Sequence, residues 1–292
     1  MNGVTYPWTA IGVIGPGRVG TALGAALADA GQSVVAVAGR PGASSTDRFV
    51  AAVGGAEPMS TAQVAQAADL VLLTVGDDEL PGVARSLAAD DAVISASRWI
   101  HTSGRHGAAV LRPITLSGGR VAACHPSQTF PTPGSGRDAL PGTAWAVTAT
   151  PHDRGWAHAF VTLLSGAPVD VREADRVRYH AALTVAANGT SAVVALARDL
   201  LRSSGVHQPE RFLEPLVTQS ASNAARHGAG ALTGPVRRGD GDTVAAHLHD
   251  LAEVLPEAVP AYRALALLAL SYARRAGLDE SRAAAIRTIL ET

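Results

Sequence analysis

The sequence GPGRVG at residues 15–20 constrains the fold of this chain more than any other segment. It follows the apolar run 9–14 and precedes a helical pattern, TALGAALADA, that stops at Gly31. Glycine permits a tight turn at position 15, close approach of a ligand to the backbone at position 17, and close packing of helix on sheet at position 20. A strand, a glycine-rich turn and a helix in this order predict the start of a β–α–β unit.

Further apolar runs continue the alternation of strands and helices through the first half of the chain. We expect strands at 34–39, 70–75, 92–96, 121–125, 143–149 and 168–171, with helical segments between most of them. Such alternation predicts a parallel sheet with helices on both faces. The fold class is therefore α/β, beginning with a Rossmann-like doubly wound sheet.

The glycine-rich turn predicts dinucleotide binding, because the helix after it directs free N–H groups and the positive end of its dipole at a pyrophosphate. A glycine-rich turn without a nucleotide is the alternative. Arg40 follows the second strand, where an acidic residue would bind the ribose of NAD, and an arginine there suits the 2′-phosphate of NADP(H). A solvated surface arginine is the alternative at this position. The expected cofactor-binding residues are Gly15, Pro16, Gly17, Arg18, Val19, Gly20, Arg40, Thr74, Val75, Gly76 and Thr102.

Asp77 and Asp78 follow the strand expected at 70–75. They could be paired catalytic carboxylates, but aspartate favours the N-cap of a helix. We therefore expect these residues to cap a helix that begins near Asp78.

The single cysteine, Cys124, stands beside His125. A zinc site needs three or four ligands, and adjacent side chains in a strand point to opposite faces, so no metal site is predicted. A thiolate nucleophile would need a cleft and a nearby base. Because Cys124 ends the apolar run VAAC, we expect a small buried side chain instead.

Two polar loops, 101–104 and 125–130, follow expected strands and should open on one crevice. We expect Ser103, Ser127 and Gln128 to position the substrate or the nicotinamide. Purely structural turns are the alternative.

The second half of the chain is predicted to be helical, which gives a dinucleotide-binding domain at 1–171 and a helical substrate and dimerisation domain at 172–292. Helices are expected at about 174–204, 209–227, 242–255, 257–276 and 279–291. On the first of these, His180, Thr184 and Asn188 share a face. Asn188 precedes a glycine, a poor pair for a helix interior that often marks a working site. The alternative is that Asn188 caps a kink and His180 is interfacial.

The segment LTGPVRRGD at 232–240 interrupts the helical half. Arg237 could bind an anionic group there. The alternative is a connection between helices, with Asp240 as the cap of the next helix.

The composition excludes several classes of function. All 24 basic residues are arginine, so lysine chemistry such as Schiff-base formation is absent. A net charge of −1 gives no reason to expect a nucleic acid or an anionic membrane as partner. No apolar run approaches the roughly 20 residues of a spanning helix, and the N-terminus does not read as a signal peptide. One cysteine and no disulfide indicate the cytoplasm.

Several motifs together indicate a family. They are GPGRVG, TVGDDEL, HTSG, CHPSQTF and LTGPVRRGD, followed by HL at 247–248. Over about residues 9–290 the chain resembles Rossmann-like proteins with a C-terminal helical domain of unknown function. It is more distantly similar to pyrroline-5-carboxylate reductases, ketopantoate reductases and the 6-phosphogluconate dehydrogenase group. The resemblance implies an NADP-dependent oxidoreductase and a homodimer whose helical domains interlock. Relatives often use a lysine four residues before an asparagine; aligned on Asn188, that place is Thr184, so their mechanism does not transfer.

The expected reaction is hydride transfer from NADPH to a C=N or C=O bond of a small, anionic metabolite, with C=N favoured. His125 or His180 would supply the proton, since histidine titrates near neutrality, and Asn188 would orient the substrate. Ser103, Ser127, Gln128, Thr184 and Arg237 are the expected substrate-binding residues. A non-catalytic NADP(H)-binding sensor or pathway-complex subunit is the first alternative. An interaction protein without nucleotide is the second.

Overall fold

The computed structural model describes residues 6–292, so part of the N-terminal segment in which no signal peptide is expected lies outside the described residues. The chain forms two compact units that divide between Ala187 and Asn188. From the sequence we expected the boundary between the two domains at 171/172. The observed division comes later because the first helix after the sheet starts within the first unit.

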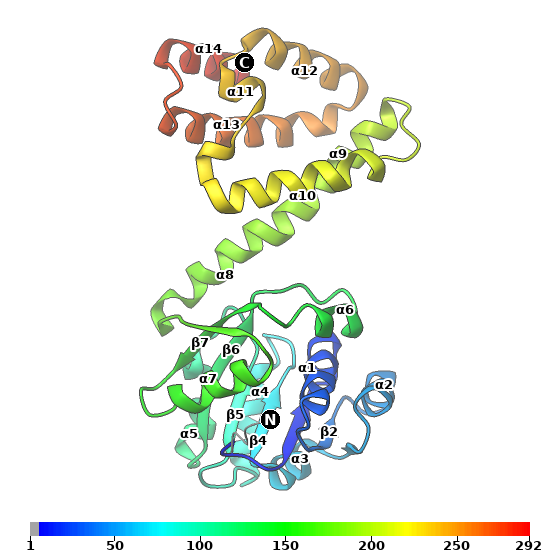
Figure 1. Cartoon of the computed structure of the whole chain (residues 1–292), viewed down its shortest axis with the longest axis vertical. Helices are drawn as coiled ribbons and strands as arrows, with labels where there is room; N and C mark the ends of the chain where they lie inside the picture. Colours follow the sequence, from blue (N-terminus) through cyan, green and yellow to red (C-terminus); the bar gives the residue numbers. More distant parts are fainter. Residues whose placement is uncertain (1–5) are drawn as a thin grey trace. The chain divides into compact units, whose positions relative to one another are not determined.

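The first unit contains one sheet of eight strands in the order β3-β2-β1-β4-β5-β6-β7-β8 (Figure 1). The strands are β1 (Ile11–Ile14), β2 (Val34–Ala38), β3 (Glu57–Pro58), β4 (Leu70–Leu73), β5 (Arg98–His101), β6 (Arg120–Pro126), β7 (Ala144–Ala149) and β8 (Ala167–Asp170). All neighbours are parallel except β6 and β7, which are antiparallel. The order reverses between β1 and β4, so that a ligand crevice is expected at the carboxyl ends of these two strands.

Helices cover both faces of this sheet, as the alternating sequence predicts. One core packs α1 (Arg18–Asp29), α2 (Ser44–Val53) and α7 (Arg154–Leu163) on the sheet, and α6 (Pro133–Asp138) lies against α1. The opposite core contains α3 (Thr61–Ala67), α4 (Leu80–Ala89), a 3₁₀ turn (Ala108–Leu111) and α5 (Arg112–Leu116). Every residue of β1 and β4 is buried, which explains why these strands read as continuous apolar runs.

Two sequence predictions about this unit are wrong. The strand expected at 92–96 is a turn in which Ala96 has a φ of 63°, and the strand begins at Arg98. Neither Asp77 nor Asp78 caps a helix, because the N-cap of α4 is Glu79 and it makes no side-chain cap. Asp78 instead lies 3.5 Å from the guanidinium of Arg105.

A long helix leads from the sheet into the second half of the chain. It consists of α8 (Arg176–Thr184), a π-helical turn (Val185–Gly189) and α9 (Thr190–Ser203). The two units divide inside the π turn, which contains Asn188. Turns of this kind frequently occur at functional sites.

The second unit is helical. Besides α9 it contains α10 (Glu210–His227), α11 (Gly234–Arg238), α12 (Gly241–Val254), α13 (Val259–Arg275) and α14 (Glu280–Glu291). The ends of α10, α12, α13 and α14 lie within two residues of those predicted, whereas the segment 232–240, expected as a connection, contains the short helix α11. Its core is formed by α12, α13 and α14 around Val244, Leu270 and Ile286. The predicted cap of α12 is confirmed: the Asp240 carboxylate accepts a 3.1 Å hydrogen bond from the Thr243 N–H.

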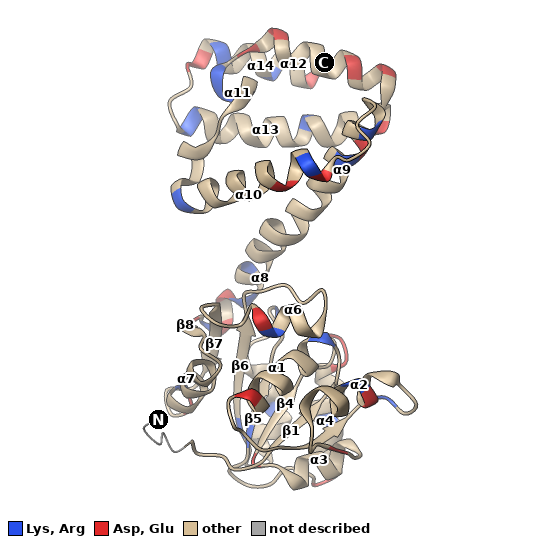
Figure 2. Cartoon of the chain, turned by 45° about the vertical axis from the view of Figure 1, so that its right-hand side comes forward, with Lys and Arg blue, Asp and Glu red and all other residues tan. Residues whose placement is uncertain are grey.

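By length and composition alone, the helix from Glu173 to Ser203 could cross a membrane, contrary to the sequence expectation, and its apolar window is not buried. No long apolar run reveals it, because alanine, threonine and serine separate the aliphatic residues. Residues 179–197 contain no aspartate, glutamate or arginine, so this part of the helix is tan in Figure 2. Part of this helix, α9, packs against α10, whereas Val185 and Val193 are exposed, and exposed apolar surface of this kind often marks a place that another element covers.

Candidate functional site

The glycine-rich turn joins β1 to α1 in the geometry that the sequence predicts. Gly15 has a φ of 100°, and a Cβ there would lie 2.7 Å from the carbonyl carbon of Thr74. A Cβ on Gly20 would lie 2.4 Å from the carbonyl oxygen of Gly15. A Cβ on Gly17, by contrast, would meet open space. The first and third glycines thus allow close packing, and the second leaves the backbone accessible.

A cavity of about 490 Å³ opens at this turn. Its lining includes Gly15, Pro16, Gly17, Arg40, Thr74, Val75 and Gly76 from the predicted set. Gly17 is the N-cap of the twelve-residue α1 and provides no side chain to occupy the first N–H groups. Such a helix end suits a pyrophosphate, and Arg40 with Ser45 in the same cavity suits a further phosphate.

Four predicted cofactor residues do not line this cavity: Arg18, Val19, Gly20 and Thr102. Thr61, Glu79 and Val83 do line it, but they were not predicted from the sequence. Glu79 accepts a 3.3 Å hydrogen bond from the N–H of Gly76. In the sequence, Glu79 stands where the helix after β4 begins. We predicted instead that the two preceding aspartates cap this helix.

A second group of polar residues lies at the carboxyl end of β6. Nδ1 of His125 lies 2.9 Å from the Tyr179 hydroxyl, and the two rings meet edge to face. The His180 ring centroid is 6.2 Å from that of His125. The loop after β5 closes the group, because a Cβ on Gly104 would lie 2.5 Å from Cδ2 of His180 and 3.0 Å from Nε2 of His125. The structure thus brings two of the three predicted catalytic residues together.

Burial lowers the pKa of His125 to about 4, and the positive charge of Arg176 acts in the same direction. His125 is therefore neutral at neutral pH. Tyr179, its hydrogen-bond partner, was not selected from the sequence. Its only sequence signal was its position beside His180.

Arg176 is the most unusual residue of this group. Its side chain is 1% exposed, yet its Nε and both Nη atoms have no hydrogen-bond partner among the described residues. Its Cζ lies 5.8 Å from the centroid of the Tyr179 ring. A buried guanidinium without partners is costly, since arginine keeps its charge in proteins.

The loop after β5 is fixed by a second buried histidine. His101 Nδ1 accepts a 3.2 Å hydrogen bond from the Ser103 N–H, so Nε2 carries the proton and donates to the carbonyl oxygen of Gly107 at 2.9 Å. Burial lowers the pKa of His101 to about 4. The Ser103 hydroxyl accepts a hydrogen bond from the N–H of His106, which leaves its own proton free to donate.

Cys124 is fully buried, and burial raises the pKa of its thiol to about 12. The prediction of a small buried side chain is confirmed. A buried thiol that stays protonated cannot act as a thiolate nucleophile. Ser127 and Gln128, after β6, are exposed, and Gln128 Oε1 accepts a hydrogen bond from the N–H of Thr129. Across residues 6–292, no three or more His, Cys, Asp or Glu side chains group as metal ligands.

The remaining predicted residues lie outside this group. Thr184 ends α8 in the first unit, whereas Asn188 and Arg237 belong to the second. Arg237 donates a 3.1 Å hydrogen bond to the carbonyl oxygen of Ala276. It lines a cavity of about 770 Å³ together with Arg238 and Arg282.

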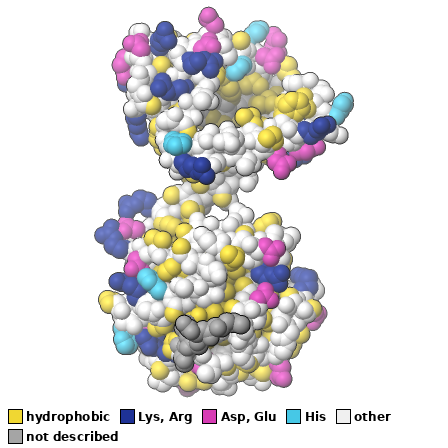
Figure 3. Space-filling view, viewed as in Figure 1, with side chains coloured by type: hydrophobic (Ala, Val, Ile, Leu, Met, Phe, Trp, Pro, Cys, Tyr) yellow, Lys and Arg dark blue, Asp and Glu magenta, His cyan; other side chains and the backbone are white. Residues whose placement is uncertain are grey.

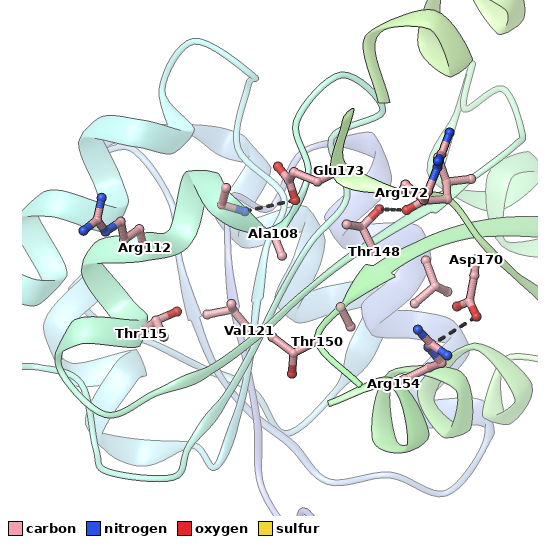
Figure 4. A pocket seen from close by; sticks show the side chains of 14 residues that line it. Ala108, Arg112, Thr115, Val121, Thr148, Thr150, Arg154, Asp170, Arg172 and Glu173 are labelled. Atoms are coloured by element: carbon pink, nitrogen blue, oxygen red, sulfur yellow. Dashed lines mark hydrogen bonds and ion pairs between the residues drawn. The ribbon is translucent and has the colours of Figure 1, made fainter. Parts of the chain in front are cut away.

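Another cavity, of about 450 Å³, lies between the 3₁₀ turn, α5 and the strands β7 and β8 (Figure 4). Its charged residues are largely paired: Arg154 lies 3.3 Å from Asp170, and Glu173 accepts a hydrogen bond from the N–H of Ala109. It lies away from the glycine-rich turn, and it has no unsatisfied buried polar group.

Residues 2–126 match the model of a Rossmann-like domain, and residues 143–269 match the domain of unknown function DUF2520. No curated protein matches the sequence. Among solved structures, a Bacteroides fragilis protein proposed to be an NADP oxidoreductase has a TM-score of 0.75 at 24% identity, covering 89% of this chain and 97% of its own.

Two further solved structures share the fold. An imine reductase from Myxococcus stipitatus in complex with NADP⁺ has a TM-score of 0.64 at 19% identity, covering 97% of this chain and 100% of its own. A pyrroline-5-carboxylate reductase from Coxiella burnetii has a TM-score of 0.54 at 17% identity, covering 90% of this chain and 97% of its own. At these identities the likeness establishes the fold of the chain.

Proposed function

This chain joins a Rossmann-like domain to a DUF2520 domain, and from that premise we propose that it is an NADP(H)-dependent oxidoreductase. It transfers hydride to a C=N or C=O bond of a small, anionic metabolite. The observation that carries the proposal is the cavity lined by both the glycine-rich turn and Arg40. An imine reductase and a pyrroline-5-carboxylate reductase among the structures of the same fold favour the C=N bond.

The residues of that cavity fit NADP(H). The N–H groups at the start of α1 would bind the pyrophosphate, which approaches the backbone at Gly17. Arg40 and Ser45 would bind the 2′-phosphate. When bound, the reduced nicotinamide supplies the hydride.

Substrate binding is proposed at the carboxyl ends of β5 and β6, beside the group that contains His125 and His180. Ser103, Ser127 and Gln128 come from the loops after these strands. Thr184 and Asn188 follow along the long helix. Arg237 is proposed to bind an anionic group in the cavity of the second unit that it lines.

We also propose that the chain is a cytoplasmic homodimer. The uncharged stretch 179–197 of the long helix exposes Val185 and Val193. The second unit also exposes Phe212 and Leu216 on α10, and hydrophobic side chains border a hollow on the face of this unit seen in Figure 3. A second copy that covers these surfaces would remove apolar area from water.

Calorimetric titration of the purified protein with NADPH and with NADH tests the proposal. We expect micromolar binding of NADPH and much weaker binding of NADH. A screen of cyclic imines and 2-keto acids then distinguishes a reductase from a non-catalytic NADP(H) sensor, which would bind the cofactor and reduce nothing. Absence of binding to either nucleotide would refute both.

A further inference from the structure

We propose that Tyr179 is the proton donor of this site, that Arg176 stabilises the phenolate it leaves, and that His125 orients its hydroxyl. The inference deepens the proposed reductase function and rests on it. It draws on three observations in the first unit: the hydrogen bond between His125 and Tyr179, the position of the Arg176 guanidinium by the Tyr179 ring, and the lack of any hydrogen bond to that guanidinium.

The hydroxyl oxygen of Tyr179 lies 2.9 Å from Nδ1 of His125, which holds the phenol at the carboxyl end of β6. The residue is half-buried and therefore not sealed from solvent. His125 in turn is confined, because the Gly104 backbone packs against its Nε2 and against His180. The hydroxyl therefore has a fixed place at the end of the sheet where a substrate is expected.

The Arg176 guanidinium is buried and cannot lose its proton, and no described residue donates or accepts a hydrogen bond with it. Among the described residues no carboxylate forms an ion pair with it. His101 and His125 are neutral and the Cys124 thiol is protonated. The charge of Glu173 raises the pKa of Arg176, but this carboxylate accepts a hydrogen bond from the Ala109 N–H and makes none with the guanidinium. A phenolate on Tyr179 would place an anion directly beside this cation.

His125 is a poor proton donor at neutral pH. Because its pKa is about 4, only about one molecule in a thousand carries the imidazolium form. From the sequence we expected His125 or His180 to supply the proton. Of the hydroxyl and imidazole groups that meet at the end of β6, Tyr179 has both a proton to give at neutral pH and a buried positive charge beside it.

The reaction balances as follows for an imine. The carbon of the C=N bond accepts a hydride from the reduced dihydronicotinamide, and the π electrons move to nitrogen. The Oη–H bond of Tyr179 breaks, and its proton forms the new N–H bond. Tyr179 is left as a phenolate beside Arg176, and it regains a proton from solvent through His125. The products are an amine and the oxidised nicotinamide.

The chain offers a matched control in its second unit. Nδ1 of His247 lies 2.8 Å from the Tyr262 hydroxyl, and the rings meet edge to face with centroids 5.7 Å apart, as in the first pair. Burial raises the pKa of Tyr262 without a counteracting arginine, whereas for Tyr179 the charge of Arg176 opposes the effect of burial. The two pairs thus differ in the buried cation.

The first experiment measures ionisation of tyrosine in the free protein by ultraviolet absorbance during a pH titration. Subtracting the spectra of Tyr179→Phe and of Tyr262→Phe, each in turn, from the spectrum of the unmodified protein assigns the ionisation of each tyrosine. In Arg176→Met the Tyr179 transition should move about one pH unit or more upward, while the Tyr262 transition stays in place. Arg176→Lys keeps the charge and should move it less. An unmoved Tyr179 transition in a folded Arg176→Met protein would overturn the role of Arg176.

The second experiment measures reduction of cyclic imines by NADPH. Tyr179→Phe should lower kcat by about 10²-fold or more and leave NADPH affinity unchanged, whereas Tyr262→Phe should leave kcat unchanged. Turnover of Tyr179→Phe within twofold of the unmodified protein would overturn the proton-donor assignment. If the unmodified protein binds no NADPH and reduces nothing, the proposed function fails and the proton-donor role fails with it, while the titration still decides the pairing of Tyr179 with Arg176.

Discussion

The Thr74 hydroxyl donates a 2.6 Å hydrogen bond to the carbonyl oxygen of Gly15. This bond ties the end of β4 to the turn after β1, at the point where the strand order of the sheet reverses. Gly20 packs against the same two groups, since a Cβ there would lie 2.5 Å from Thr74 Oγ1. The backbone at the floor of the proposed cofactor cavity is thus fixed by one hydroxyl and two glycines.

Substitution of two of these glycines separates packing from ligand binding. Gly20→Ala should lower the free energy of unfolding by about 1–3 kcal/mol, because the methyl group must displace backbone. Gly17→Ala should leave stability nearly unchanged, because its Cβ meets open space, yet weaken NADPH binding by obstructing the pyrophosphate. Urea denaturation and calorimetric titration of both variants check this. NADPH affinity that survives in Gly17→Ala would argue against a pyrophosphate at this turn.

Arg40 should determine the preference for NADPH over NADH. Hydrogen bonds to charged groups contribute about 1.5–3 kcal/mol, so Arg40→Ala should weaken NADPH binding by roughly 10- to 100-fold and leave NADH binding unchanged. Arg48→Ala is the matched control, because Arg48 donates a hydrogen bond to Ser44 nearby but does not line the cavity. Equal losses for both nucleotides in Arg40→Ala would contradict recognition of the 2′-phosphate.

The fold was largely predictable because its signals are local. Strands β1 and β4 are buried on both faces and read as apolar runs, and the cap of α12 lies within four residues. The start of β5 was missed because its residues include Arg98 and His101, which resemble a loop more than a strand. This segment is a strand because it pairs with β4 and β6, and such pairing cannot be predicted from a local sequence pattern.

The candidate site was predictable only in part, for the same reason. The glycine-rich turn is contiguous in sequence, and its geometry follows from three glycines. The group of Arg176, Tyr179 and His125 assembles from segments about fifty residues apart, and arginine is almost never fully buried without a partner. Nothing in the composition or the spacing singled out Arg176, and its burial emerges only from the fold.

Acid should destabilise the protein through His101. Its folded pKa is about 4, below the ordinary value of 6.5, so the unfolded chain takes up its proton first as the pH falls. The stabilisation is complete above about pH 6.5 and is lost as the pH falls toward 4, with a total on the order of 3 kcal/mol. Denaturation by urea across this range should show a steeper loss for the unmodified protein than for His101→Gln. Parallel pH profiles would contradict a neutral, buried His101.

The uncharged helix should carry the contact between two copies of the chain. Val193 on α9 is 41% exposed within the stretch 179–197, and an arginine there would place a charge in a dry contact. Val169 on β8 is 52% exposed and lies outside this helix, so Val169→Arg is the matched control. Light scattering should give twice the 29.7 kDa chain mass for the unmodified protein and for Val169→Arg, and a lower mass for Val193→Arg. If Val193→Arg keeps the full dimer mass at micromolar concentration, the contact lies elsewhere, since a desolvated, unpaired arginine at its centre would cost several kcal/mol.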